Sequence, residues 1–443
     1  MTSGTLPRVN VVGLGKLGAP LAAVLASRGF DVIGLDVNKV LVDAMNAGKM
    51  PIIEPQLNEL IAANRARLKA TMDANEAIQN SDCSFVIVPT PSGSDGFFSN
   101  RFVIQAMETL GKALRTKKGY HVVVITSTVM PGSTGSEIKA ALEAASGRKV
   151  GPDLGLCYNP EFIALGSVVQ DMLYPDSILV GESDNKAGDM LARIYLQMCV
   201  NKPPVQRMNW ISAELTKIAV NTYVTTKISY ANMLADICDR LPGADVDVVT
   251  KALGADTRIG AKYLKGAMGY GGPCFPRDNV AFAALAKKIG ARADVAVATD
   301  AINNHQVARL SDLVAKFAKT GTRISIVGLS YKPQTPVVEE SHSVKLAEHL
   351  ADAGYVVTVH DPLAQDAALA VLGEKVVGAS SLESAVRDCD LLIVGTGWPE
   401  YKDIDPAWAK RSGARLTVLD LWRTLPADKF TAVADVIYLG YGR

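Results

Sequence analysis

Residues 8–18 read RVNVVGLGKLG, and the type of fold in the first part of the chain follows from this stretch. Residues 8–12 have the apolar composition of a strand that is buried on both faces. The glycines of residues 13–18 have the spacing G-x-G-x-x-G, and the apolar run 21–27 predicts a helix that ends at Gly29. A buried strand, a glycine turn and a helix in this order are typical of a parallel sheet covered by helices.

The glycine turn also predicts a dinucleotide site. Glycines let backbone N–H groups approach a pyrophosphate, and the helix N-terminus adds a partial positive charge. Asp36 ends the next predicted strand, where a carboxylate accepts a hydrogen bond from a ribose 2′-OH and repels a 2′-phosphate. The sequence therefore predicts NAD rather than NADP, although glycines that only pack a helix against a sheet are the alternative. The predicted cofactor-binding residues are Gly13, Gly15, Lys16, Leu17, Gly18, Asp36, Thr90 and Thr128.

The strand pattern continues and then returns late in the chain. Thr90 and Thr128 follow further apolar strands at 84–88 and 121–126, at the sheet edge where open α/β folds bind ligands. A second set of apolar strands lies at 323–327, 356–359, 391–394 and 416–419. This second set predicts another doubly wound domain. Its first turn, 328–332, has lost the glycine spacing, so we expect it to bind something other than a dinucleotide.

A long helix is predicted between the two halves. Ser212-Ala213-Glu214 predicts its start, with a hydroxyl cap and an early acid, and neither Gly nor Pro interrupts the pattern before about Arg240. The predicted fold class is α/β, with two Rossmann-like doubly wound parallel-sheet domains joined by a long central helix. The predicted domains are residues 1–205, 206–310 and 311–443. Because a long helix between domains often supports a dimer interface, we expect a homodimer.

Composition excludes several classes of protein. The chain has 443 residues with 46 Lys and Arg against 45 Asp and Glu, which argues against a nucleic-acid-binding surface. The first residues lack the pattern of a secretory signal, and no apolar run is long enough to span a membrane, so we expect a cytoplasmic protein. Six cysteines without a C-x-x-C pair and five scattered histidines predict no metal site.

One cysteine has unusual surroundings. Residues 269–278 read GYGGPCFPRD, and the glycines free the backbone to approach a ligand. Pro276 fits the first turn of a helix, so Cys274 lies just before a helix N-terminus and close to Arg277. Both features stabilise a thiolate, which is the nucleophile of covalent catalysis, and Asp278 lies four residues on. The alternative is a glycine-rich bend with a buried cysteine.

Two further segments carry candidate catalytic groups. Lys217 and Asn221 are four residues apart on the predicted helix, so they share a face and can stabilise a developing alkoxide. A solvated lysine on a helix surface is the alternative. Asn159-Pro160-Glu161-Phe162 follows an apolar strand, and a carboxylate at this place can act on water as a general base.

Taken together, these residues resemble the UDP-glucose/nucleotide-sugar 6-dehydrogenases over essentially the full length. The order of several specific motifs carries the resemblance. They are Gly13–Gly18 with Asp36, Gly48–Leu60 with Pro51 and Glu54-Pro55, Val88-Pro89-Thr90-Pro91, Ser127-Thr128-Val129 with Pro131-Gly132, Asn159–Phe162, Lys217 with Asn221, Asp256 with Arg258-Ile259-Gly260, the Cys274 loop, Lys332-Pro333 and Asp361-Pro362.

The resemblance implies an activity, which is the NAD-dependent four-electron oxidation of the C6 alcohol of UDP-glucose to UDP-glucuronate. In this family a cysteine adds to the sugar aldehyde, a second hydride transfer gives a thioester, and hydrolysis releases the uronic acid. A covalent adduct keeps the carbon in place for the second oxidation. The resemblance also implies that residues 311–443 bind the UDP-sugar.

The implied roles fall on named residues. Cys274 matches the cysteine that forms the thiohemiacetal, Lys217 and Asn221 match the oxyanion-stabilising pair, and Asp278 matches an acid/base partner. Thr128 and Glu161 match residues that position or activate water. Arg258 matches an arginine that often reaches the nucleotide sugar from the partner subunit. The implied substrate-binding residues are Glu161, Phe162, Lys217, Asn221, Arg258, Tyr263, Leu264, Gly271 and Lys332.

The chain departs from the family pattern at four positions. Leu165 replaces a second acid after Glu161, and Glu339 stands where an arginine near the cofactor is usual. Leu41 stands where a basic residue often helps with the adenosine ribose, and Pro273 replaces the serine before the cysteine. The loop is nevertheless more similar to the UDP-glucose branch than to the N-acetylhexosamine branch, where a histidine usually precedes the cysteine.

Three alternatives remain open at this point. The substrate could be another nucleotide sugar, a UDP-N-acetylhexosamine or GDP-mannose. A two-electron hydroxyacid dehydrogenase would share the first domain and the Lys217/Asn221 pair, but it leaves Cys274 and the second domain without a purpose. A non-catalytic nucleotide-sugar or NAD sensor is motivated by Leu165 and Glu339.

Overall fold

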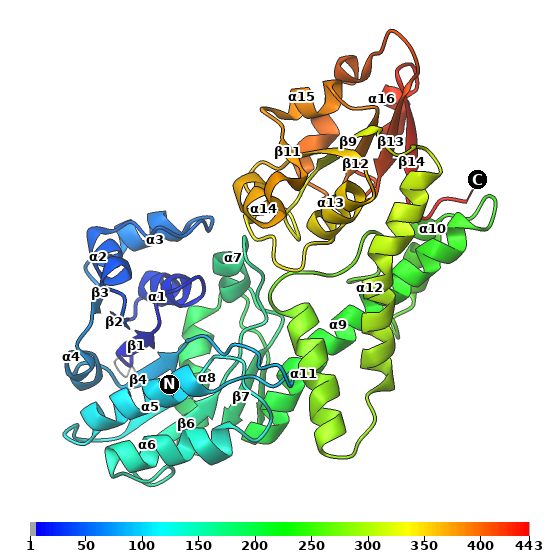
Figure 1. Cartoon of the computed structure of the whole chain (residues 1–443). Helices are drawn as coiled ribbons and strands as arrows, with labels where there is room; N and C mark the ends of the chain where they lie inside the picture. The colour runs from blue at the N-terminus through cyan, green and yellow to red at the C-terminus, as the bar shows by residue number, and fades with distance from the viewer. Residues whose placement is uncertain (1–5, 443) are drawn as a thin grey trace. The chain divides into compact units, whose positions relative to one another are not determined.

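The computed structural model describes residues 6–442 and divides the chain into two compact units, Met1–Ala219 and Val220–Arg443. Each unit contains a parallel or largely parallel sheet with helices packed on it (Figure 1). The two units are described separately below. The predicted fold class is confirmed by this pair of α/β sheets and by the long helix α9 (Trp210–Asp239).

The sheet of the first unit has the strand order β3-β2-β1-β4-β5-β6-β7-β8. Its strands are β1 (Val9–Val12), β2 (Val32–Leu35), β3 (Leu68–Thr71), β4 (Cys83–Val86), β5 (His121–Ile125), β6 (Leu154–Tyr158), β7 (Ile178–Glu182) and β8 (Val205–Met208). Most neighbours are parallel, but β7 pairs antiparallel with β6. The segment between β6 and β7 leaves the carboxyl end of β6 as an irregular loop and then forms the short helix α7 (Val168–Leu173).

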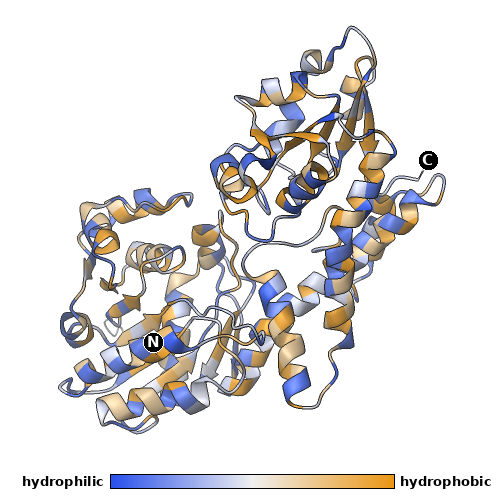
Figure 2. Ribbon diagram, in the orientation of Figure 1, coloured by the Kyte–Doolittle hydropathy of each residue, from blue (hydrophilic) through white to orange (hydrophobic). Residues whose placement is uncertain are grey.

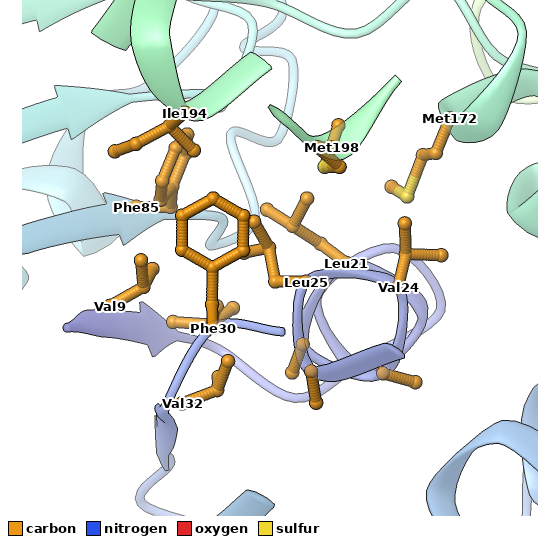
Figure 3. Close-up of a cluster of buried hydrophobic side chains, with 14 of the residues drawn as sticks. Val9, Leu21, Val24, Leu25, Phe30, Val32, Phe85, Met172, Ile194 and Met198 are labelled. Atoms are coloured by element: carbon orange, nitrogen blue, oxygen red, sulfur yellow. The ribbon is translucent and has the colours of Figure 1, made fainter. Parts of the chain in front are cut away.

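The helices of the first unit follow the strands along the chain. They are α1 (Gly18–Ser27), α2 (Lys39–Ala47), α3 (Leu57–Ala63), α4 (Ala74–Gln79), α5 (Arg101–Leu114), a π-helical turn (Thr134–Ile138), α6 (Lys139–Ser146), α7 (Val168–Leu173) and α8 (Asn185–Met198). Figure 3 shows Leu21 and Leu25 of α1 packing with Phe30 and Phe85, close to Ile194 of α8. Burial of these large side chains fixes α1 and α8 against the sheet; truncating Phe30 to Ala would cost about 3–5 kcal/mol.

The second unit repeats the topology of the first. Its sheet has the order β11-β10-β9-β12-β13-β14, which matches the first six strands of the other sheet, and every pair is parallel. The strands are β9 (Arg323–Val327), β10 (Val356–His360), β11 (Val377–Gly378), β12 (Leu391–Val394), β13 (Leu416–Asp420) and β14 (Ala434–Tyr438). The order is typical of a dinucleotide-type doubly wound sheet, as the recurring apolar strands predict.

Helices also form the part of the second unit that precedes its sheet. After α9 come α10 (Val246–Ala255), α11 (Phe275–Lys288) and α12 (Asp294–Ala315), and the sheet is covered by α13 (His342–Asp352), α14 (Gln365–Leu372), α15 (Leu382–Arg387) and α16 (Ala427–Phe430). Short 3₁₀ turns lie at Gly373–Lys375, Pro399–Asp403 and Pro406–Ala409. Hydrophobic and hydrophilic residues alternate along α12, so this helix has both a buried and a solvated face (Figure 2).

The predicted cap of the long helix, Ser212, is wrong by three residues. The helix begins at Trp210, and the Ser212 backbone N–H donates to Asn209 Oδ1 at 2.9 Å. Asn209 therefore caps the helix in place of Ser212. Glu214, expected to serve the start of its own helix, accepts hydrogen bonds from another segment instead.

Among residues 6–442, no helix is both long and apolar enough to cross a membrane. The same residues contain no group of three or more His, Cys, Asp or Glu side chains that could hold a metal ion.

Candidate active site

The glycine turn of the first unit has the geometry of a dinucleotide cradle. A Cβ on Gly13, where φ is +93°, would lie 2.1 Å from the Ile87 carbonyl oxygen. A Cβ on Gly18 would lie 1.8 Å from the Gly13 carbonyl oxygen, so both positions exclude any side chain. A Cβ on Gly15 would meet nothing within 4 Å, and Gly15 is exposed. The space at Gly15 is therefore open for a ligand to approach the backbone.

The helix that follows the turn leaves its N-terminus available. No side chain caps α1, and its first turn contains no acid, so its partial positive charge is not neutralised locally. Lys16 is exposed and Leu17 is half-buried at the same turn. A pyrophosphate fits this set of N–H groups and cation.

Asp36 is held beside the turn by two backbone donors. Leu14 N–H donates to Asp36 Oδ2 at 2.6 Å, and Asn38 N–H donates to Oδ1 at 2.8 Å. These bonds fix the half-buried carboxylate at the end of β2, while each oxygen keeps a lone pair for a ribose hydroxyl. The residues that the sequence predicts for NAD thus fit that cofactor. Leu41, the departure near Asp36, packs against the core of the first unit.

The loops after β4 and β5 are joined to each other. Thr90 Oγ1 donates to the Thr128 carbonyl oxygen at 2.8 Å, and Ser127 Oγ both accepts from Val88 N–H and donates to the Val88 carbonyl. Thr90 is buried, whereas Thr128 is half-buried. The structure therefore brings together the two threonines predicted from separate motifs.

Glu214 holds the second of these loops from α9. Its carboxylate accepts from Gly132 N–H at 2.6 Å and from Thr134 N–H at 2.8 Å. Burial raises the pKa of Glu214, and the hydrogen bonds from Thr134 and Gly132 partly offset this increase. Because Glu214 is fully buried, it is a structural acceptor that sets the path of the segment after Thr128.

The loop after β6 positions Glu161 through several separate contacts. Lys217 Nζ donates to the Glu161 backbone carbonyl at 2.7 Å, and Tyr195 Oη donates to Glu161 Oε1 at 3.0 Å. Farther along, Glu54 accepts from Gly166 N–H at 2.8 Å and from Val168 N–H at 2.7 Å. Glu54 lies in the Glu54-Pro55 motif, so this motif braces the Glu161 loop.

The electrostatics of Glu161 favour a proton acceptor that works near neutral pH. Burial raises the pKa of Glu161 to about 7, while the Tyr195 hydrogen bond and the charge of Lys217 act in the opposite direction. A carboxylate with this pKa is suited to general base catalysis. Lys217 itself is buried, and its Nζ lies 4.8 Å from the centre of the half-exposed Phe162 ring.

In the second unit, Cys274 is the exposed cysteine of the chain, and the other five are buried. It immediately precedes α11, which has Pro276 in its first turn as predicted. Burial raises the pKa of the Cys199 thiol to about 12 and raises those of Cys83, Cys157, Cys238 and Cys389 as well. Those five thiols therefore stay protonated, and Cys274 is the candidate nucleophile.

Asn221 and Asp278 form a buried pair beside the helix that Cys274 starts. Asn221 Nδ2 donates to Asp278 Oδ2 at 2.6 Å, and the Arg277 guanidinium lies 3.3 Å from Asp278 Oδ1. Asp278 is fully buried, so its carboxylate depends on these donors. Lys217 and Asn221 lie one turn apart on α9, but their hydrogen-bond partners belong to different units.

The cysteine loop packs against the first turn of the second sheet. Gly272 N–H donates to the Glu339 carbonyl oxygen at 2.9 Å. A Cβ on Gly271 would lie 2.4 Å from the Glu340 carbonyl oxygen, and one on Gly272 would lie 2.7 Å from the Tyr331 ring. The glycines are thus required by this packing. Glu339, a departure from the family pattern, contributes its backbone here, and its side chain is exposed.

The remaining predicted ligand residues belong to the second unit. Lys332 is half-buried in the turn after β9. Tyr263 is exposed with φ +64°, and Leu264 is buried. Arg258 is exposed after α10, with its guanidinium 2.6 Å from Asp256 Oδ2.

Three residues that position the site were not predicted as such. Tyr195 lies in α8, 34 residues from Glu161, and no local motif distinguishes it. In the sequence, Glu214 has the position of a helix-start acid, and Ser127 precedes Thr128 without a feature that marks its own role. A buried polar residue inside an apolar helix pattern is the one signal that the sequence offers for Tyr195.

Comparison with known families covers most of the chain. Models of the UDP-glucose/GDP-mannose dehydrogenase family match three successive parts. The NAD binding domain matches residues 7–199, the central domain matches residues 211–305, and the UDP binding domain matches residues 325–427.

Individual relatives agree with these matches. A UDP-glucose 6-dehydrogenase of Haloferax volcanii is 35% identical over 401 residues, covering 90% of this chain and 93% of the relative. A GDP-mannose 6-dehydrogenase of Pseudomonas aeruginosa is 30% identical, covering 90% and 93%. The structure of a UDP-glucose dehydrogenase from Pyrobaculum islandicum is 32% identical with a TM-score of 0.88, covering 100% of this chain and 99% of that one.

Proposed function

The chain belongs to the UDP-glucose/GDP-mannose dehydrogenase family and carries its NAD binding domain, and we propose that it oxidises the C6 alcohol of UDP-glucose to UDP-glucuronate in two NAD-dependent steps. The observation that carries the proposal is the exposure of Cys274 at the start of α11, while every other cysteine is buried. A two-electron alcohol oxidation needs no thiol, whereas a four-electron oxidation uses one to hold the aldehyde carbon.

The proposed roles conserve atoms and charge. NAD, when bound, supplies the hydride acceptor for both oxidations. The C6 alcohol first loses a hydride and a proton to become an aldehyde, and the Cys274 thiolate then forms a C–S bond to the aldehyde carbon. Lys217 and Asn221 stabilise the negative oxygen that results. Loss of a second hydride turns this adduct into a thioester.

Hydrolysis then releases the product. Glu161 takes a proton from water, the water oxygen bonds to the thioester carbon, and the C–S bond breaks with Cys274 leaving as the thiolate. Thr128 helps to position that water, and Asp278 acts as the acid/base partner. The pKa of Glu161, raised by burial to about 7, supports its part in this step.

The remaining proposed roles concern ligand binding. Gly13, Gly15, Lys16, Leu17, Gly18, Asp36, Thr90 and Thr128 bind NAD, and Phe162, Arg258, Tyr263, Leu264, Gly271 and Lys332 bind the nucleotide sugar. The match of residues 325–427 to the family's UDP binding domain supports a UDP-sugar. The relatives named for UDP-glucose support glucose as the sugar, and the GDP-mannose 6-dehydrogenase at 30% identity makes GDP-mannose the second candidate.

A panel assay tests the proposal. Formation of NADH is measured with UDP-glucose, UDP-N-acetylhexosamines and GDP-mannose, and ligand binding is measured in parallel by calorimetry. UDP-glucose should give the highest kcat/KM. A higher value with GDP-mannose or a UDP-N-acetylhexosamine would replace the proposed substrate, and binding without NADH formation from any sugar would contradict the proposed activity.

We further propose a homodimer formed through the central helices in the cytoplasm. Part of α9 in the second unit presents exposed apolar side chains, with Tyr223, Tyr230 and Ile237 at seven-residue intervals on one face. Such an exposed stripe is suited to packing against a second copy. Sedimentation of Tyr230→Glu as a monomer, beside a dimeric parent chain, would support this interface.

A further inference from the structure

Tyr195 lies where it can control the carboxyl group of Glu161. Its side chain is almost fully buried in α8, and its ring packs edge-on against Phe85 with 6.2 Å between ring centroids. This packing fixes the phenol oxygen. Tyr195 Oη has two acceptors within reach, Asn159 Oδ1 at 2.5 Å and Glu161 Oε1 at 3.0 Å.

The hydrogen-bond directions follow from Asn159. Its Nδ2 donates to the Leu179 carbonyl oxygen at 2.7 Å, so the amide must be turned with Oδ1 toward Tyr195. Asn159 is therefore an acceptor from Tyr195. The phenol has one proton to donate, and its oxygen can also accept.

These directions allow two arrangements of one network. When Glu161 carries its proton on Oε1, this hydroxyl donates to Tyr195 Oη, and Tyr195 donates to Asn159; when the proton is on Oε2, Oε1 accepts from Tyr195. When Glu161 is a carboxylate, Tyr195 can turn its O–H toward Oε1. The same three side chains thus hold the carboxyl group in either protonation state, and the 2.5 Å contact between Tyr195 Oη and Asn159 Oδ1 lengthens when the phenol turns its proton toward Glu161.

The other groups described near Glu161 do not replace Tyr195 as the hydrogen-bond partner of its carboxyl group. The Lys217 ammonium donates to the Glu161 backbone carbonyl, and its positive charge lowers the pKa of the Glu161 carboxyl. The Cys199 thiol donates to the Met172 carbonyl oxygen at 3.6 Å, and burial raises its pKa to about 12, so it stays neutral. The pKa of Tyr195 is likewise raised well above its usual value by burial, so the phenol remains a donor.

No second carboxylate in the loop after β6 is available to replace Glu161 as the proton acceptor. Leu165 packs against the hydrophobic core of the first unit. Glu54 is engaged by two backbone N–H groups, and Asp171 accepts from Ala164 N–H and Ser167 Oγ. Glu161 is the carboxylate that remains, and the hydrogen bonds described for it engage only Oε1.

We propose that Tyr195, assisted by Asn159, is a positioning residue that anchors Glu161 Oε1 and thereby directs Oε2 to the water that hydrolyses the thioester. The proposal rests on the proposed function, because it assumes that Glu161 is the proton acceptor. The proton passes from water to Oε2, and the Tyr195 hydrogen bond on Oε1 stabilises the carboxylate that receives it.

The test is an infrared titration of the Glu161 carboxyl in the full-length protein. The protonated C=O band is followed against pH in the parent chain and in Tyr195→Phe, which keeps the ring but removes the hydroxyl. Glu161→Gln identifies the band by its disappearance. Loss of a hydrogen bond to a charged group should move the midpoint upward by about one to two pH units. An unchanged midpoint would overturn the proposal.

Tyr401→Phe is the matched control. Tyr401 is fully buried in the second unit, and its hydroxyl has no hydrogen-bond partner among the described residues. Its substitution should leave the Glu161 midpoint unmoved, and a shift equal to that of Tyr195→Phe would also overturn the proposal.

Kinetics separate this inference from the proposed function. Tyr195→Phe should lower kcat at pH 7 by about fivefold or more, with recovery at high pH and unchanged KM for NAD. If Glu161→Gln retains normal turnover, the proposed role of Glu161 fails even though the titration still reports the anchor. If Glu161→Gln is inactive but Tyr195→Phe leaves both the titration and the pH profile unchanged, the inference alone fails.

Discussion

Substitution of Gly15 and of Gly18 by alanine should have opposite consequences, although both belong to the same turn. A Cβ on Gly18 would lie 1.8 Å from the Gly13 carbonyl oxygen and 2.9 Å from its carbon. These are backbone atoms that cannot swing aside, so Gly18→Ala must displace the turn or the helix. Overpacking of this kind costs about 3 kcal/mol, which corresponds to a Tm lowered by about 6–12 °C for a unit of this size.

Gly15→Ala meets no such obstacle in the protein. No atom lies within 4 Å of the added Cβ, and the backbone is not in the left-handed region. Stability should stay within about 1 kcal/mol of the parent chain and can rise slightly, because alanine restricts the unfolded state. The methyl group instead occupies the space through which a pyrophosphate reaches the backbone. Losing one hydrogen bond to a charged group costs about 1.5–3 kcal/mol, so the Kd for NAD should rise about 10- to 150-fold.

Calorimetry measures both quantities on the same samples. Scanning calorimetry gives Tm, and isothermal titration with NAD gives Kd. The reasoning predicts a folded Gly15→Ala that binds NAD poorly and a destabilised Gly18→Ala. A Gly15→Ala protein with the parent Kd would show that the cofactor does not approach this backbone, and a Gly18→Ala protein with the parent Tm would show that the turn is looser than its geometry implies.

Three further predictions concern single side chains. The folded Glu161 carboxyl keeps its proton up to about pH 7, whereas an ordinary one releases it near 4.5, so the folded state binds more protons between these values and stability falls as pH rises through that window. The free energy of unfolding of Glu161→Gln, relative to that of the parent chain, should therefore increase by about 2 kcal/mol from pH 5 to pH 8, as measured by urea unfolding. The same difference between variant and parent at both pH values would refute this. Glu214→Ala leaves two N–H donors without their acceptor and should lose about 2–4 kcal/mol in the same assay, while Glu214→Gln, which keeps one acceptor oxygen, should lose less; no difference between the two would contradict the capping role. Cys274→Ser should reduce uronate formation by on the order of 10³-fold or more with little change in Tm, because the side chain is exposed; near-normal turnover would favour a two-electron hydroxyacid dehydrogenase.

The parts of the site that obey local rules were predictable from the sequence. The glycine turn requires positive φ at Gly13 and close backbone contact at Gly18, and such requirements appear directly as a residue spacing. The start of α11 was also predictable, because proline fits a first helical turn. The apolar strands of both sheets were also recognisable, because a buried strand is a local run of apolar residues.

The parts that depend on distant contacts were not predictable. Tyr195 reaches Glu161 across 34 residues, and Glu214 reaches Gly132 across 82, so only the folded chain brings them together. The antiparallel pairing of β7 with β6 depends on sheet assembly rather than on the residues of β7. The start of α9 differs from its prediction because Asn209 and Ser212 are both good caps, and the fold uses the earlier one.

The use of Cys274 as a covalent carrier is tested most directly by the ratio of NADH formed to UDP-glucose consumed, measured in one reaction with the product identified by mass spectrometry. We predict about two NADH for each UDP-glucose, with UDP-glucuronate as the product and a transient thioester on the peptide that contains Cys274. One NADH for each UDP-glucose, with the free aldehyde as the product and Cys274 unmodified throughout, would contradict it.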